Sequence, residues 1–84
     1  MHLNNEFVED VELLALFRLD SAQEGLKIHH DAAPERLSAA QRLFDKKLTS
    51  LADGGYLTPL GIQAAEHAHA LLRILREDGW HTAP

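Results

Sequence analysis

The sequence contains no cysteine, few aromatic residues and no long hydrophobic run. The absence of cysteine excludes disulfides, zinc sites built on thiolates, and a cysteine nucleophile. The longest strictly apolar run, Leu13–Phe17, is far too short to span a bilayer. The N-terminus also lacks the basic and then apolar segments of a secretory signal. We therefore expect a cytoplasmic protein that has no membrane partner.

The chain is also poor in basic residues, with 13 acidic against 8 basic side chains and a net charge of −5. Residues 1–33 carry a charge of −5, residues 34–58 carry +1 and residues 59–84 carry −1. Phosphate contacts supply most of the non-specific affinity for nucleic acids, so the acidic total disfavours a DNA partner. Only the middle segment could gather such contacts.

Sequence patterns typical of catalysis and metal binding are missing as well. There is no glycine-rich phosphate loop, and nothing in the sequence suggests a base held beside a nucleophile. The six histidines include no pair four residues apart on a predicted helix, the spacing of helical zinc sites. We therefore expect no enzyme, no cofactor and no metal. His67 is expected at the edge of the core and His69 in solvent.

What is present is ordinary for one small globular domain over residues 1–84, with 45% apolar residues. We expect a core over about residues 5–78 and a tail over 79–84. Helical spacing of apolar residues predicts a first helix from about Asn5 to Leu19, capped by Asn4 or Asn5. The alternation in Leu26–His29 predicts a short strand. A last helix is expected from Pro59 to about Asp78, with Thr58 as its N-cap.

The segment 32–53 allows more than one interpretation. Apolar residues spaced by 3, 4, 4 and 3 positions fall within one helical arc, and they are Leu37, Ala40, Phe44, Leu48 and Leu51. This spacing predicts a helix that continues to about Asp53 and stops at Gly54 and Gly55, one of them with a positive φ. The alternative, an Asp-Gly hairpin, remains open. Ser38 and Gln41 match a capping box, so the segment is either one helix or a short helix followed by a longer one from Ala39.

Tyr56–Thr58 is the second strand candidate, and we expect it to pair with residues 26–29. The predicted order is thus helix, strand, one or two helices, strand, helix. The fold class is mainly α with a minimal two-stranded β element, and a wing that is absent or very short. The small residues of the last helix allow another helix to approach closely. We expect a candidate dimer seam there, formed by Gly61, Ala65, Ala68 and Leu72.

The run SAAQRLFDKKLTSLADGGYLTPLG resembles the part of a winged-helix domain in which a longer helix leads into a strand. The runs GLKIHHDAAPERLSAAQRLF and DGGYLTPLGIQAAEHAHALL are similar to a family of very short, uncharacterised gammaproteobacterial proteins that carry a DNA-binding assignment. The likeness covers roughly residues 5–76. It implies a nucleic-acid-binding face on the helix 39–53, formed by Ser38, Arg42, Lys46 and Thr49.

The chain departs from the winged-helix pattern because no basic wing follows this helix, and because Asp45 shares the face with the basic residues. Two functions therefore stand beside each other. The resemblance implies a small, non-enzymatic DNA-binding regulatory module. The acidic composition favours a protein-interaction module without nucleic acid, which binds a protein partner or a second copy of itself.

Overall fold

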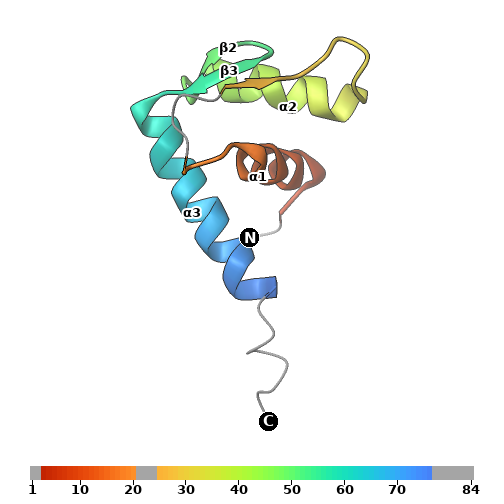
Figure 1. Ribbon diagram of the computed structural model, residues 1–84. Helices are drawn as coiled ribbons and strands as arrows, with labels where there is room; N and C mark the ends of the chain where they lie inside the picture. Colours follow the sequence, from red (N-terminus) through yellow and green to blue (C-terminus); the bar gives the residue numbers. More distant parts are fainter. Residues whose placement is uncertain (1–2, 21–24, 77–84) are drawn as a thin grey trace.

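The computed structural model describes residues 3–20 and 25–76, and within them three helices pack together, with a small antiparallel sheet at one end (Figure 1). In chain order the elements are α1 (Asn5–Leu16), β1 (Leu26–Lys27), α2 (Pro34–Asp45), β2 (Thr49–Leu51), β3 (Gly54–Leu57) and α3 (Pro59–Arg76). The mainly helical class is confirmed, but the sheet has three strands rather than the predicted two. The predicted end of the last helix at Asp78 and the tail 79–84 lie outside the described residues.

Side-chain caps begin two of the helices as predicted. The Oδ1 of Asn4 accepts a hydrogen bond from the amide of Phe7 at 2.9 Å, and so caps α1. The Oγ1 of Thr58 accepts from the amide of Gly61 at 3.0 Å, and so caps α3. The first helix is shorter than predicted: α1 ends at Leu16 instead of about Leu19, and the chain is extended at Phe17.

The segment 32–53 contains a single helix, α2, and Ser38 does not start a second one. Pro34 is the first helical residue, where its missing amide costs nothing. Ser38 lies inside the helix, so the capping-box interpretation is wrong. A serine and a glutamine three residues apart recur by chance inside helices, and here the position of the proline determines the start.

The helix does not continue to Asp53, and this prediction is wrong. The amide of Lys47 donates to the carbonyl of Phe44, and the amide of Leu48 donates to the carbonyl of Leu43, each at 2.9 Å. Together with a φ of 65° at Lys47, these bonds form a Schellman motif, which ends the helix. Apolar spacing misled the prediction because Phe44 and Leu51 are 39% and 55% exposed and so are not core positions.

Strands β2 and β3 form a hairpin instead. Thr49 pairs with Leu57, and Leu51 pairs with Gly54, which leaves Ala52 and Asp53 as the turn. The hairpin alternative was therefore the correct one, although the turn lies one residue earlier than an Asp-Gly turn. Gly54 and Gly55 both have a positive φ, 117° and 76°, and they start strand β3 rather than stop a helix.

The sheet has the order β1-β3-β2, so β1 pairs with the strand that contains Tyr56, but it does so through Gly54 and Gly55 and not through the predicted Tyr56–Thr58. Leu26 pairs with Gly55, and Lys27 pairs with Gly54. A Cβ at Gly54 would collide with the carbonyl oxygen of Leu26, so only glycine lets β1 approach this closely. The amide of Ile28 donates to the carbonyl of Asp53 at 2.8 Å and continues the contact beyond β1.

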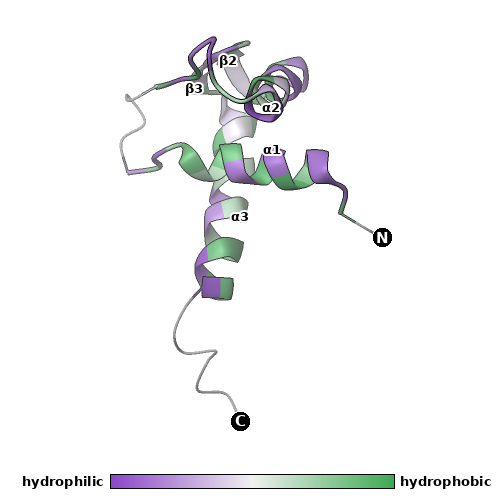
Figure 2. Cartoon of the chain, turned by 90° about the vertical axis from the view of Figure 1, so that its right-hand side faces the viewer, coloured by the Kyte–Doolittle hydropathy of each residue, from purple (hydrophilic) through white to green (hydrophobic). Residues whose placement is uncertain are grey.

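The core lies where the three helices meet, next to the sheet. Its buried apolar side chains are Leu13, Leu14, Phe17, Ile28, Ala39, Ala40, Leu43, Ala65 and Ala68. Helix α1 packs against both α2 and α3. The C-terminal half of α3 extends beyond the other elements in both views (Figures 1 and 2). This projecting half keeps a large solvent-exposed surface.

Candidate nucleic-acid interface

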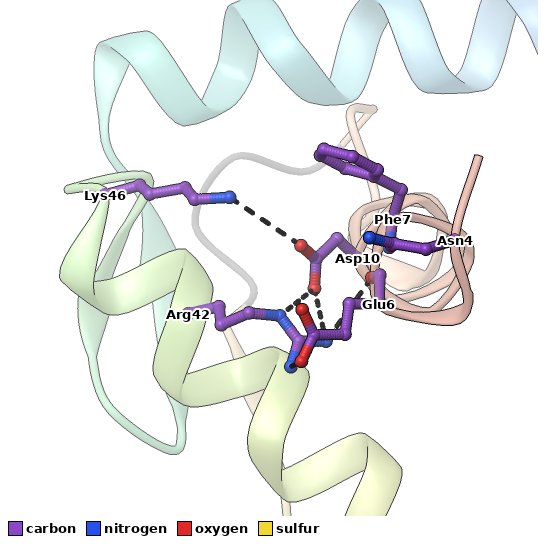
Figure 3. A network of polar contacts seen from close by, with 6 residues as sticks. All are labelled: Asn4, Glu6, Phe7, Asp10, Arg42 and Lys46. Atoms are coloured by element: carbon purple, nitrogen blue, oxygen red, sulfur yellow. Dashed lines mark hydrogen bonds and ion pairs between the residues drawn. The ribbon is translucent and has the colours of Figure 1, made fainter. Parts of the chain in front are cut away.

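Arg42 is held by helix α1 and does not project into solvent (Figure 3). Its Nε and Nη2 lie 2.9 Å and 2.8 Å from the Oδ1 of Asp10. Nη2 also donates to the backbone carbonyl of Glu6 at 3.3 Å. Only 23% of the Arg42 side chain and 10% of the Asp10 side chain are exposed. The guanidinium therefore serves to join α2 to α1.

This pair also determines the electrostatics of the face. The hydrogen bond that Arg42 donates to Asp10 raises the pKa of the guanidinium above its ordinary value, and the negative charges of Glu6 and Glu9 add to the shift. Arg42 thus stays charged, but the carboxylates around it neutralise that charge. A phosphate would have to compete with a buried carboxylate for the same donors.

Lys46 lies one turn further along α2 and also faces α1. Its Nζ is 3.8 Å from the Oδ2 of Asp10 and 5.9 Å from the centre of the Phe7 ring (Figure 3). More than half of the side chain, 54%, remains exposed. The ammonium can leave this weak pairing at small cost, so Lys46 remains available to a partner.

Ser38 is exposed on α2, as predicted, but its surroundings are acidic. It lines a shallow cavity of about 250 Å³ together with Glu6, Glu9 and Glu35. The three carboxylates outnumber the guanidinium of Arg42, which also lines this cavity, and give this part of the face a negative potential. Such a potential repels a phosphate backbone.

Thr49 is not on the helix at all, and this part of the predicted face is wrong. It lies in strand β2, is 4% exposed, and its Oγ1 donates to the carbonyl of Leu51 at 3.2 Å. The early end of α2 is the physical reason, because a residue four positions beyond Asp45 can no longer share the helical face. The four predicted contact residues are therefore not brought together on one exposed surface.

The predicted dimer seam faces inward. Gly61, Ala65 and Ala68 are buried, and Leu72 is partly buried. A Cβ at Gly61 would collide with the carbonyl oxygen of Leu48, so the small residues serve the approach of the chain's own backbone. The stripe was correctly recognised as a close-packing surface, but a second copy cannot reach it without opening the fold.

The sequence analysis did not identify Asp10 as a residue of the site. A signal was present, because Asp10 lies three, four and seven residues before Leu13, Leu14 and Phe17. These positions share one helical face, and all of them are buried. An acid on a buried face requires a cationic partner, and Arg42 is that partner.

The histidines also differ from the expectation, since His67 is exposed and His69 is partly buried. The Nε2 of His69 lies 2.8 Å from the carbonyl oxygen of Phe17, and because a carbonyl only accepts, this nitrogen carries the proton. Within the parts of the chain that the structure describes, no three His, Asp or Glu side chains gather as a metal site.

Comparison with known proteins places the chain in a family. The model of a family of unknown function, DUF5669, matches residues 1–76, nearly the whole chain. The chain belongs to DUF5669. The match agrees with an uncharacterised small protein family, and it adds no assignment to DNA binding or to a bacterial group. No curated protein and no solved structure matches this DUF5669 chain. No helix among its described residues is long and apolar enough to cross a membrane.

Proposed function

We propose that this chain is a non-enzymatic protein-interaction module whose partner is a second copy of itself. The observation that carries the proposal is a second, outward-facing apolar stripe on α3, called the outer stripe below. Its members are Leu60, Ala64, His67, Leu71 and Ile74, of which Ala64 is half-buried against the core and His67 is the one polar residue. The predicted dimer seam, called the inward stripe below, consists of Gly61, Ala65, Ala68 and Leu72. Each of the first four members of the outer stripe lies one position before a member of the inward stripe, so its side chain is rotated by about 100° about the helix axis from the face that packs on the core.

The outer stripe has the periodicity of a helix-pairing surface. Its spacings are 4, 3, 4 and 3 residues, the heptad pattern with which two helices pack side by side. Leu60, Leu71 and Ile74 are 53%, 52% and 56% exposed, and the neighbouring Leu75 is 56% exposed. Single exposed apolar residues are common, but a periodic row of them on one helix face is a contact surface.

The charge distribution favours a second copy as the occupant. The charged residues of α3, namely Glu66, Arg73 and Arg76, lie on faces turned away from the outer stripe. A chain of net charge −5 can therefore pair with its copy through this uncharged stripe while its acidic α1 stays at a distance. The projection of the C-terminal half of α3 beyond the other elements leaves room for a partner helix (Figure 2).

The area limits the affinity. Four half-exposed Leu and Ile side chains on each copy contribute about 1 kcal/mol each when they are covered, or about 8 kcal/mol for the pair. Association itself costs at least about 4 kcal/mol, so at most about 4 kcal/mol remains, and the stripe alone supports a dissociation constant near millimolar. The expected assembly is a reversible dimer.

Sedimentation velocity from micromolar to millimolar concentration tests the proposal. The wild-type chain should move from monomer to dimer across this range, and Leu71→Glu should remain monomeric. Leu51→Glu is the matched control, since Leu51 is 55% exposed but lies on the hairpin. A monomeric wild type, or equal behaviour of the two variants, would refute the outer stripe as the contact.

Nucleic-acid binding is the second candidate function. It is favoured by the resemblance and by two adjacent lysines, Lys46 and Lys47, which are exposed where α2 turns into the hairpin. Titration of a fluorescent DNA duplex at low salt should give binding that weakens steeply as salt rises. The double variant Lys46→Glu/Lys47→Glu should abolish it. The absence of binding by the wild type at low salt would refute this function and leave self-association untouched.

A further inference from the structure

A cavity of about 690 Å³ lies between α1 and α3, on a different side of α3 from the outer stripe. Arg73 and Arg76 of α3 line it, and Arg36 of α2 reaches it. Among the described residues that line it, Glu12 of α1 is the one acid. The four charged side chains give this cavity a net charge of +2, in a chain whose net charge is −5. A local concentration of cations against the overall charge attracts an anion.

Arg36 supplies a second, independent observation. Its Nη1 is buried and has no hydrogen-bond partner within residues 3–20 and 25–76. Buried polar atoms almost always have a partner, and a guanidinium N–H without an acceptor loses its hydration without compensation. An acceptor that enters the cavity beside Arg36 would remove this penalty.

His69 lines the same cavity and is held in a fixed orientation. Its Nε2 donates to the carbonyl of Phe17 at 2.8 Å, which ties α3 to the end of α1. The ring therefore has only Nδ1 left for another partner. The cavity thus combines guanidinium donors on two helices with an imidazole that the end of α1 positions.

The remaining walls are apolar. Leu16 and Ala15 of α1 face Leu72 of α3 across the cavity. A bare inorganic ion would use only the arginines, whereas a ligand with an apolar or aromatic part would also cover these walls. The volume falls in the range of small-molecule sites.

We propose that this cavity binds a small organic phosphate monoester. A phosphate monoester carries a charge of about −1.5 to −2 at neutral pH, which matches the net charge of the lining. Guanidinium groups recognise phosphate oxygens through pairs of parallel hydrogen bonds, and Arg36 has an unused donor for this purpose. The site is independent of the outer stripe, so a monomeric chain would bind in the same way.

Titration with phenyl phosphate, followed by NMR at low ionic strength, tests the proposal. Saturable shifts are expected for the side chain of Arg36 and for His69. Inorganic phosphate should bind more weakly because it leaves Leu16 and Leu72 uncovered, and benzoate more weakly because it carries one charge. Equal affinity for benzoate, or shifts at other residues alone, would overturn the assignment to a phosphate monoester.

Two substitutions in the cavity and one control outside it distinguish binding at this site from general attraction between charges. Arg36→Gln should weaken phenyl phosphate binding about tenfold, the loss expected for one charge-assisted hydrogen bond. Arg76→Gln should act in the same direction, and it lies on the exposed end of α3, where folding is little affected. Lys47→Gln removes one positive charge far from the cavity and should leave binding unchanged. Equal losses in all three variants, or no saturable binding by the wild type, would overturn the proposal.

Discussion

Glycine at position 47 should make the protein more stable than alanine there, because Lys47 occupies a backbone conformation that favours glycine. Its φ is 65°, in the left-handed region, and it is the C′ residue of the Schellman motif that ends α2. A residue with a Cβ pays about 1–2 kcal/mol there. Glycine avoids this strain but loses about 0.4–1 kcal/mol through its greater freedom in the unfolded chain.

The matched comparison is Lys47→Gly against Lys47→Ala. Both variants lose the charge and its favourable interaction with the helix C-terminus, so their difference isolates the backbone. We expect the glycine variant to exceed the alanine variant by about 1 kcal/mol, the strain minus the entropy term. For a domain of this size the difference corresponds to about 4–8 °C in Tm.

Urea denaturation followed by circular dichroism measures the free energy of unfolding of both variants. The midpoint should differ while the slope stays the same, because the surface exposed on unfolding is unchanged. Equal stability, or a more stable alanine variant, would mean that the chain leaves α2 without a left-handed residue at position 47. The account of how the hairpin begins would then be wrong.

Three further substitutions test the packing and the ion pairs. Arg42→Met should cost about 3 kcal/mol in urea denaturation by leaving Asp10 buried without its partner, and the double variant with Asp10→Leu should recover most of the loss. Gly61→Ala should lower the melting temperature, although alanine is the better helix former, because its Cβ would collide with a backbone carbonyl. The hydrogen bond from Lys27 lowers the pKa of Asp53, so its stabilisation is present above the ordinary pKa and is lost as pH falls through the lowered one. Carboxyl NMR should show this pKa rising in Lys27→Met, and an unchanged pKa would contradict the pairing.

The sequence predicted the elements that local signals determine. Asn4 and Thr58 are capping residues directly before apolar helices, and both caps are present. The alternation of Leu26 and Ile28 predicted a strand, and β1 begins at Leu26, although it pairs with Gly54 and Gly55 rather than with Tyr56–Thr58. These predictions succeeded because each depends on a few neighbouring residues.

The end of α2 could not be predicted, because it depends on a lysine in a conformation that glycine usually adopts. With a glycine at position 47 the stop signal would have been visible. Gly54 and Gly55 instead placed the predicted end at about Asp53, eight residues beyond the observed end at Asp45. They are needed for a different reason, since β1 lies against Gly54 and leaves no space for a side chain. This contact joins residues distant in sequence.

The predicted nucleic-acid-binding face was wrong because it too depends on contacts between residues distant in sequence. Arg42 and Lys46 are on the predicted helix, but Asp10, the residue that binds the Arg42 guanidinium, lies in α1, 32 residues away in the sequence. The spacing of the inward stripe on α3 predicted a close-packing surface, but it could not show that the chain's own elements, and not a second copy, pack against it. Only the arrangement of the helices reveals that the adjacent face of α3 is the one left exposed.

The central claim is that α3 pairs with its own copy through the outer stripe. Because the chain has no cysteine, Gln63→Cys gives a single site for a spin label beside the stripe. The labelled chain is mixed with ¹⁵N-labelled wild type, so any broadening of amide signals comes from the other copy. We predict broadening along Leu60–Ile74 and none in α2. Signals that stay sharp throughout, or that broaden first in the hairpin, would contradict the claim.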